Sequence, residues 1–274
     1  MCLLTVPHTI EPKIPIAYHS VVNLFDTIDE TPLIENRQEI ATLIGRNTAF
    51  HEAACRLINA TYQLLYDNYK TALVCTNTAK ISKVCKRLYE RELKNKDGKK
   101  AVCHRRLLSA ITPQGNLIYD DTIKSLCERV YLIKDDFEAS SFTIMEQMFD
   151  YAIKGKHEVY ACYCPIFGRI EHLLIPDLNL GFVTANKFIN PDVTPYRTIN
   201  FMRFTDIERL KLKKQRLAFN RKVATELISE SIKTLRIAKS NHDSIEKHYI
   251  NSVDWDMVNA KTEDIISRIK SRFK

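Results

Sequence analysis

Glycine is scarce in this chain of 274 residues: it occurs six times, about 2% of the sequence, whereas soluble proteins average about 7%. No two of these glycines lie closer than 13 positions. Phosphate loops and dinucleotide-binding fingerprints need glycines two to five positions apart, because backbone N–H groups must approach the phosphate closely. The spacing therefore excludes an intact site of either kind.

Long apolar runs are also missing. No run approaches the roughly 18 residues that span a bilayer, and the first fifteen residues, MCLLTVPHTIEPKIP, show no basic region and no apolar stretch of signal-peptide length. With 45% hydrophobic and 27% charged residues, the chain can bury a sizeable core. We expect a folded cytoplasmic protein without a membrane segment. Its eight cysteines have no framework spacing and are predicted to be buried thiols rather than disulfides.

The net charge of +8 is concentrated in two segments. Residues 80–106 carry 11 basic and 3 acidic side chains, and residues 203–240 carry 11 and 4. Stripes of this kind bind nucleic-acid phosphates or an acidic partner in some proteins, and are solvated helix faces in others. We call the densest part of the second segment the basic stripe; its cations are Arg209, Lys211, Lys213, Lys214, Arg216, Arg221 and Lys222.

Residues 19–94 and 196–273 follow one plan at an offset of about 177. Each copy has a short apolar strand that ends in Asn, a charged amphipathic stretch of about 35 residues, a polar turn and a second helix. Thr78 and Asp254 are the predicted N-caps of the two second helices. The plan predicts two copies of a helical hairpin.

The segment between the copies alternates strands with short helices. Strands are expected over 105–111, 129–134, 158–164, 173–175 and 180–184, and helices over 119–128 and 140–154. This alternation predicts an α/β layer with a largely parallel sheet, flanked by the two hairpins. The expected parts are residues 1–101, mostly the first hairpin with a linker over 94–100, then the α/β domain at 102–190 and the second hairpin at 191–274.

The turn from the strand at 129–134 into the next helix is unusual in its charge. Such turns present free N–H groups and a positive helix end to anions. Here the turn contains three carboxylates, those of Asp135, Asp136 and Glu138, and neither a glycine nor a lysine after Lys134. Because these charges repel a triphosphate, the turn is predicted not to bind nucleotide in the usual way.

Three segments resemble a known family: HRRLLSAITPQG at 104–115, YLIK at 131–134 and IEHLLIPDL at 170–178. They are similar to an uncharacterised family of bacterial P-loop ATPase-like proteins, common in spore-forming Firmicutes and sometimes labelled nucleotide kinases. Segments 7–12 and 238–255 are similar to it as well. The family has two tandem units, each a P-loop α/β domain followed by a helical hairpin. The resemblance implies a P-loop-NTPase-like fold with ATP and magnesium as ligands. The family's first P-loop domain would lie before Met1, so the chain would correspond to the end of the first unit plus the whole second unit.

Two departures from the family pattern shape the functional expectation. The family's glycine-rich loop falls on residues 135–143, where Ser141 takes the lysine position, Phe142 takes the following hydroxyl position and Thr143 keeps a family-like residue. The strand that ends at Asn186 lacks the carboxylate that holds magnesium in such folds. We therefore expect a catalytically inactive structural or regulatory unit that holds no metal. The degenerate phosphate-loop positions are Lys134, Ser140, Ser141 and Thr143.

Two other functions stay open at this point. The chain is alternatively an ATP-binding protein or nucleotide kinase that needs a partner or a missing unit, or a binder of nucleic acid or an acidic partner through the basic stripe. Self-association through an apolar face is a further expectation. Cys162, Cys164 and His172 resemble a partial metal site, but no second pair at zinc spacing accompanies them, so the cysteines are expected to be core or pocket-lining thiols and His172 a structural residue.

Overall fold

The structure, a computed structural model, describes residues 22–93 and 100–272. The chain divides into two compact units. We call Phe50–Ile237 the α/β unit, and Met1–Ala49 with Ala238–Lys274 the helical unit. Most of the first expected strand (19–23), segment 7–12 and most of the expected linker lie outside the described residues. Among the helices that are described, none has both the length and the apolarity that crossing a membrane requires.

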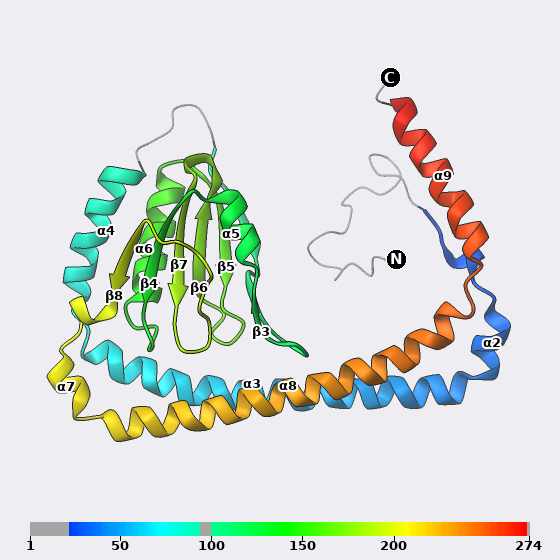
Figure 1. Cartoon of the computed structure of the whole chain (residues 1–274), viewed down its shortest axis with the longest axis horizontal. Coiled ribbons are helices and arrows are strands. Elements are labelled where there is room, and N and C mark those ends of the chain that lie inside the picture. Colours follow the sequence, from blue (N-terminus) through cyan, green and yellow to red (C-terminus); the bar gives the residue numbers. More distant parts are fainter. Residues whose placement is uncertain (1–21, 94–99, 273–274) are drawn as a thin grey trace. The chain divides into compact units, whose positions relative to one another are not determined.

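The α/β unit contains a six-stranded sheet in the order β1-β5-β6-β7-β4-β8 (Figure 1). Strand β6 is antiparallel to both of its neighbours, and the remaining strand pairs are parallel. This arrangement confirms an α/β fold with a mainly parallel sheet. The strands are β1 (Val102–Arg106), β4 (Arg129–Lys134), β5 (Glu158–Tyr163), β6 (Ile170–Ile175), β7 (Leu180–Ala185) and β8 (Arg197–Asn200).

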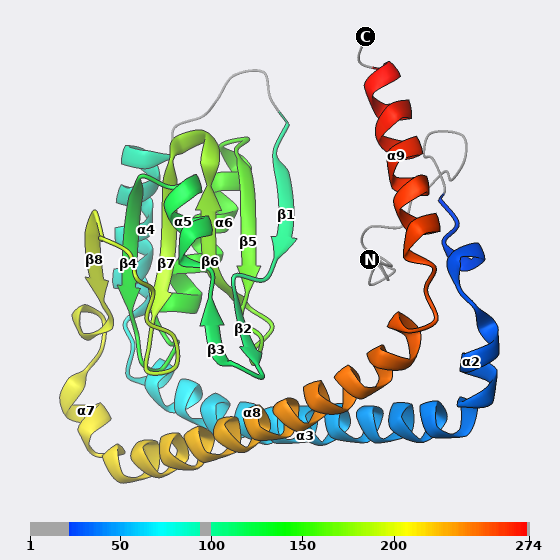
Figure 2. The ribbon, with the colours of Figure 1, turned by 45° about the vertical axis from the view of Figure 1, so that its right-hand side comes forward.

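The single strand expected over 105–111 is wrong. The chain leaves the sheet after Arg106, and β2 (Ser109–Thr112) pairs instead with β3 (Gly115–Ile118) in a separate antiparallel hairpin (Figure 2). Leu107 is 64% exposed while Leu108 is buried beneath α5. The run has strand propensity throughout, but two different pairing partners divide it into two strands.

Helices cover both faces of the sheet. Because side chains alternate along a strand, Tyr131 and Ile133 of β4 face the core beneath α4 (Thr78–Glu92) and α6 (Ser141–Lys154). Val130 and Leu132 face the opposite core, beneath α5 (Asp120–Leu126). α5, α6 and β4 match the elements expected from the sequence closely.

The α/β core extends beyond the expected domain limits of 102–190. Ile81 and Leu88 of α4 and Ile199 of β8 belong to the same buried cluster as the centre of the sheet. The apolar face of α4 is buried against α6 and not against the preceding long helix, so α4 is part of the α/β layer. Its N-cap is Asn77, whose side chain accepts the Lys80 N–H at 2.9 Å, and not Thr78 as the sequence indicated.

Two long helices, α3 (Arg37–Val74) and α8 (Lys214–Ile250), contribute residues to both units. In the α/β unit, Asn68 Nδ2 donates to the Leu217 carbonyl at 3.1 Å. In the helical unit, Asn241 Nδ2 donates to the Leu43 carbonyl at 2.8 Å. The long helices therefore pair with each other, which corrects the expectation that each one folds back on its own shorter helix. α8 and α9 (Trp255–Arg272) begin 177 residues after α3 and α4, an offset consistent with the repeat, which stays a prediction.

The remaining elements are short. In the helical unit, η1 (Phe25–Thr27) and α2 (Glu30–Glu35) precede α3. Asp254 caps α9 as predicted, because its side chain accepts the Met257 N–H at 2.9 Å. Lys261 of α9 forms an ion pair with Asp26 of η1. In the α/β unit, η2 (Pro176–Leu178) joins β6 to β7, and η3 (Phe201–Arg203) and α7 (Ile207–Lys211) join β8 to α8.

Candidate functional site

The turn between β4 and α6 lies at the carboxyl end of the parallel strands. Lys134, the last residue of β4, is paired with Ala185, the last residue of β7. Open α/β sheets bind their ligands in the crevice outside the carboxyl ends of the strands. This turn is therefore the first place to look for a site.

The Asp135 carboxylate fills the position where an anion would bind. It is 1% exposed and accepts four hydrogen bonds: from the Phe137 N–H at 3.0 Å, the Ser140 N–H and hydroxyl at 2.7 Å each, and the Ser141 N–H at 3.0 Å. Burial raises the pKa of this carboxyl, and the donated hydrogen bonds act in the opposite direction. The N–H groups at the start of α6 that a phosphate would use are thus already bonded to the chain itself.

Glu138 closes the turn from the other side. Its backbone has φ of 61°, in the left-handed region that favours glycine and is uncommon for other residues. Its buried carboxyl accepts hydrogen bonds from the Ser141 hydroxyl at 2.7 Å and from the Asn186 amide. Burial, with the charges of Asp135 and Glu171, raises the pKa of Glu138 well above its usual value. A glycine-like backbone therefore carries a buried acid.

The four predicted phosphate-loop residues lie together in this turn, but most of their polar groups bond to the turn itself. Ser140 and Ser141 are buried and donate to the turn's carboxylates. The Thr143 hydroxyl donates to the Ala139 carbonyl at 3.2 Å. Lys134 is exposed at the end of β4.

Phe142, which the resemblance placed at the hydroxyl position after the lysine position, is a packing residue. It is 1% exposed, and its ring lies 5.8 Å from that of Tyr69 on α3 and 5.1 Å from that of Phe167. Phe142 therefore packs the start of α6 against α3.

A second set of buried polar groups lies beside the turn on β6. Glu171 accepts the Ser109 hydroxyl at 2.6 Å, and His172 Nε2 lies 3.2 Å from its carboxylate. The Thr184 N–H donates to His172 Nδ1 at 3.2 Å, so His172 is a buried structural residue, as expected. Burial opposes ionisation of Glu171, but the neighbouring His172 and the hydrogen bond from the Ser109 hydroxyl outweigh it and lower the pKa of Glu171. Sequence reasoning missed Ser109 and Glu171, because the two residues are 62 positions apart.

The cavity in front of the turn is small. Its volume is about 40 Å³, and Glu138, Glu171, Asn186 and Cys164 are among the polar residues in its mainly apolar lining. Ligand sites for drug-sized molecules have volumes of about 300–1,000 Å³. The cavity has no room for a nucleotide in this conformation. Cys164 lines it, and Cys162 is buried in the core beneath α5, in agreement with the expected roles of these thiols.

The basic stripe is partly neutralised by its own surroundings. Arg216 forms an ion pair with Asp67, Lys211 pairs with Glu208, and the Arg221 guanidinium lies 5.0 Å from the centre of the Phe137 ring. The Arg209 guanidinium donates to a backbone carbonyl of α3. Lys213, Lys214 and Lys222 are exposed and have no such contact within the described part of the chain.

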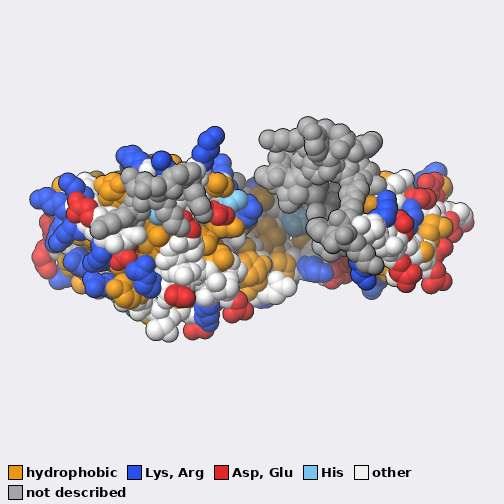
Figure 3. Space-filling model, turned by 90° about the horizontal axis from the view of Figure 1, so that it is seen from above, with side chains coloured by type: hydrophobic (Ala, Val, Ile, Leu, Met, Phe, Trp, Pro, Cys, Tyr) orange, Lys and Arg blue, Asp and Glu red, His pale blue; other side chains and the backbone are white. Residues whose placement is uncertain are grey.

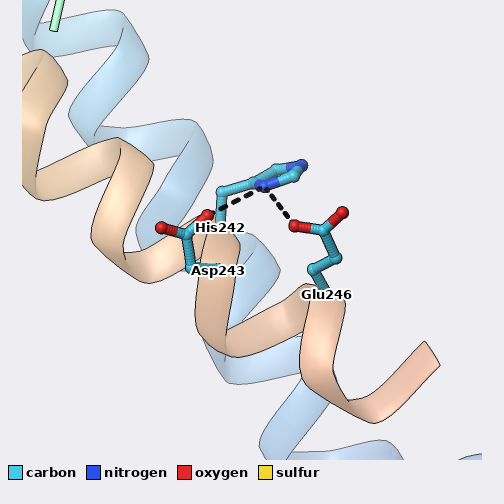
Figure 4. Close-up of side chains that lie close together, drawn as sticks. All are labelled: His242, Asp243 and Glu246. Atoms are coloured by element: carbon cyan, nitrogen blue, oxygen red, sulfur yellow. Dashed lines mark ion pairs between the residues drawn. The ribbon is translucent and has the colours of Figure 1, made fainter. Parts of the chain in front are cut away.

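One group on α8, in the helical unit, has residue types that can bind a metal (Figure 4). His242 Nδ1 lies 3.9 Å from an Asp243 oxygen and 4.0 Å from a Glu246 oxygen. Lys239 already forms an ion pair with Asp243. Because His242 and Glu246 are exposed and the Asp243 carboxylate is already paired with Lys239, we interpret the group as a surface ion-pair cluster.

Comparison of the chain with protein-family models, with curated protein sequences and with solved structures finds no match.

Proposed function

We propose that the α/β unit is a P-loop-ATPase-like domain whose phosphate-binding turn is closed by its own carboxylates, and that the protein acts as a non-catalytic structural or regulatory unit. The observation that carries the proposal is the set of hydrogen bonds to Asp135. The N–H groups of Ser140 and Ser141 at the start of α6 are the donors that this kind of fold offers to a phosphate. Here a buried carboxylate accepts both.

Two further features support the same proposal. The left-handed backbone at Glu138 is what a glycine-rich loop would leave if its glycine were replaced. The end of β7 carries Asn186, whose amide bonds to Glu138, in place of a carboxylate that could hold magnesium. The N–H groups that would bind phosphate, and the side chain at the magnesium-binding position, therefore form hydrogen bonds within the turn instead.

The proposal is tested by thermal unfolding of the purified chain with ATP, GTP and ADP, with and without magnesium, together with an ATP hydrolysis assay. A ligand of the folded state raises the melting temperature by mass action. We expect no hydrolysis and no stabilisation that requires magnesium. A magnesium-dependent shift that Thr143→Ala abolishes would overturn the proposal and favour an ATP-binding protein or nucleotide kinase.

A second candidate function, binding of an acidic protein partner, has one specific observation in its favour. A groove of about 340 Å³ runs between η3, α7 and α8 of the α/β unit, and apolar side chains such as Met202 and Leu210 are part of its lining. Lys211, Lys214 and Arg221 of the basic stripe border it. An acidic amphipathic peptide matches this pattern, and Lys214→Glu should abolish its binding in a fluorescence polarisation assay, while Lys222→Glu should weaken it only modestly.

A further inference from the structure

A second cavity in the α/β unit lies between α4 and the edge strand β8. Its volume is about 220 Å³, and Val84, Leu88 and Ile199 form much of its apolar wall. Four arginines line it, two from α4 and two from β8 and η3: Arg87, Arg91, Arg197 and Arg203. The fold thus brings together guanidinium groups from two parts of the chain that are about a hundred positions apart in the sequence.

The acidic group at this cavity is already shared by two arginines. Glu92 is buried, and its carboxylate accepts Arg91 Nε at 2.8 Å and Arg129 Nη1 at 2.6 Å. The Tyr131 hydroxyl donates to the same carboxylate at 2.5 Å. Burial raises the pKa of Tyr131 to about 12, so its hydroxyl stays protonated and keeps donating. Glu92 therefore has no capacity to neutralise a further cation.

Among the described residues, the other three arginines have no carboxylate partner. Over residues 22–93 and 100–272, no Asp or Glu lies within ion-pair distance of Arg87, Arg197 or Arg203. The Arg197 guanidinium lies 5.5 Å from the Tyr196 ring centre, and that of Arg203 lies 6.0 Å from the Phe204 ring centre. Aromatic contacts restrict a guanidinium without removing its charge. The cavity therefore carries a concentrated positive charge, and Figure 3 shows Lys and Arg side chains gathered on the side where Figure 1 places α4 and β8.

We propose that this cavity binds the oligophosphate group of a small molecule, such as a diphosphate or triphosphate. Guanidinium groups pair with phosphate through two parallel hydrogen bonds. A volume of about 220 Å³ is smaller than the roughly 300–1,000 Å³ of drug-sized sites, which suits an anionic head group better than a peptide or a stretch of nucleic acid. This site uses no group of the closed turn, so it is independent of the function proposed above.

The arginines have a competing explanation, since charged side chains on an edge strand such as β8 also discourage pairing with other chains. Isothermal titration calorimetry with inorganic pyrophosphate, without magnesium and at matched ionic strength, separates the two. The test variant is Arg87→Ala with Arg203→Ala. The control is Arg56→Ala with Lys233→Ala, which removes two exposed charges outside the cavity.

We expect the wild-type chain to bind pyrophosphate, the test variant to bind at least tenfold more weakly, and the control to change by less than twofold. Binding should also weaken steeply as salt is added. Arg87→Lys with Arg203→Lys should recover part of the affinity, because the charges return without the planar fork. If Arg87→Ala with Arg203→Ala does not fold, this lysine variant and single Arg203→Ala give the same comparison.

Three results would overturn the assignment. The wild-type chain does not bind pyrophosphate; or the test and control variants lose affinity equally, which would show a general charge effect; or a single-stranded RNA oligonucleotide binds at this surface while pyrophosphate does not. The third result would place the arginines in a nucleic-acid surface.

Discussion

Replacing Asp135 by Ala should both destabilise the α/β unit and open an anion site. The substitution leaves the buried N–H groups of Ser140 and Ser141, and the partly buried N–H of Phe137, without their acceptor. A buried polar group without a partner costs about 1–3 kcal/mol. Burial raises the pKa of Asp135, which means that burying its charge is itself unfavourable, so removing the carboxylate offsets part of that cost. We therefore expect a net loss of about 2–5 kcal/mol, and at about 2–4 °C per kcal/mol for a domain of this size the melting temperature should fall clearly.

Phosphate or sulfate should then restore stability to Asp135→Ala selectively, because the free N–H groups at the start of α6 can bind it. A ligand at ten times its dissociation constant stabilises the folded state by about 1.4 kcal/mol. The measurement is thermal unfolding, followed by circular dichroism, over a phosphate titration at constant ionic strength. Wild type is measured in the same buffers, so that anion effects elsewhere on the protein cancel in the difference.

The matched control for this prediction is Asp136→Ala. Asp136 precedes the same helix but is partly exposed, so its loss should cost no more than about 0.5 kcal/mol. Asp135→Asn should fall between the two, because an amide oxygen can replace one carboxylate oxygen but not both. If Asp135→Ala melts within a degree of wild type, or if phosphate stabilises both proteins equally, the Asp135 carboxylate does not substitute for a bound anion.

Two further predictions concern buried carboxylates and are measured by denaturant unfolding across pH. Because the folded-state pKa of Glu138 is raised, the folded protein binds its proton more tightly, and stability should fall as pH rises from about 4.5 through the folded pKa. Glu138→Gln should remove this pH dependence of the free energy of unfolding, and above the folded-state pKa of Glu138 the variant should be more stable than wild type. An unchanged pH dependence would contradict a raised pKa at Glu138. Burial opposes ionisation of Glu92, but hydrogen bonds from Tyr131, Arg91 and Arg129 outweigh it and lower the pKa of Glu92. The ionised Glu92 side chain therefore contributes to the free energy of unfolding above about pH 4.5, and this contribution is lost as pH falls through the folded-state pKa. Glu92→Gln should cost about 1–3 kcal/mol at pH 7, less than a fully buried pair because both arginines remain partly exposed, and an unaltered midpoint would argue against this network.

The sequence by itself determined the local elements of the α/β unit. Strand β4 and helix α6 lie where the sequence predicted them, because a short continuous apolar run favours a strand that is buried on both faces and an apolar stripe at helical spacing favours a helix. The same local chemistry identified the turn between them as unusual, since three carboxylates without a glycine cannot form an ordinary phosphate loop.

Pairing between distant segments was decided only by the tertiary structure. Three features depend on which partner buries an apolar face: the division of 105–111 into two strands, the burial of α4 against the sheet and the pairing of α3 with α8. The sequence pattern does not identify that partner. The hydrogen bonds to the Asp135 carboxylate likewise depend on tertiary structure, because the N–H groups that donate them point toward it only once α6 has formed. The arginine cavity shows the limit most clearly. Arg91 and Arg197 belong to segments with no local relation, and they meet because parallel pairing of β8 with β4 places that edge strand beside α4.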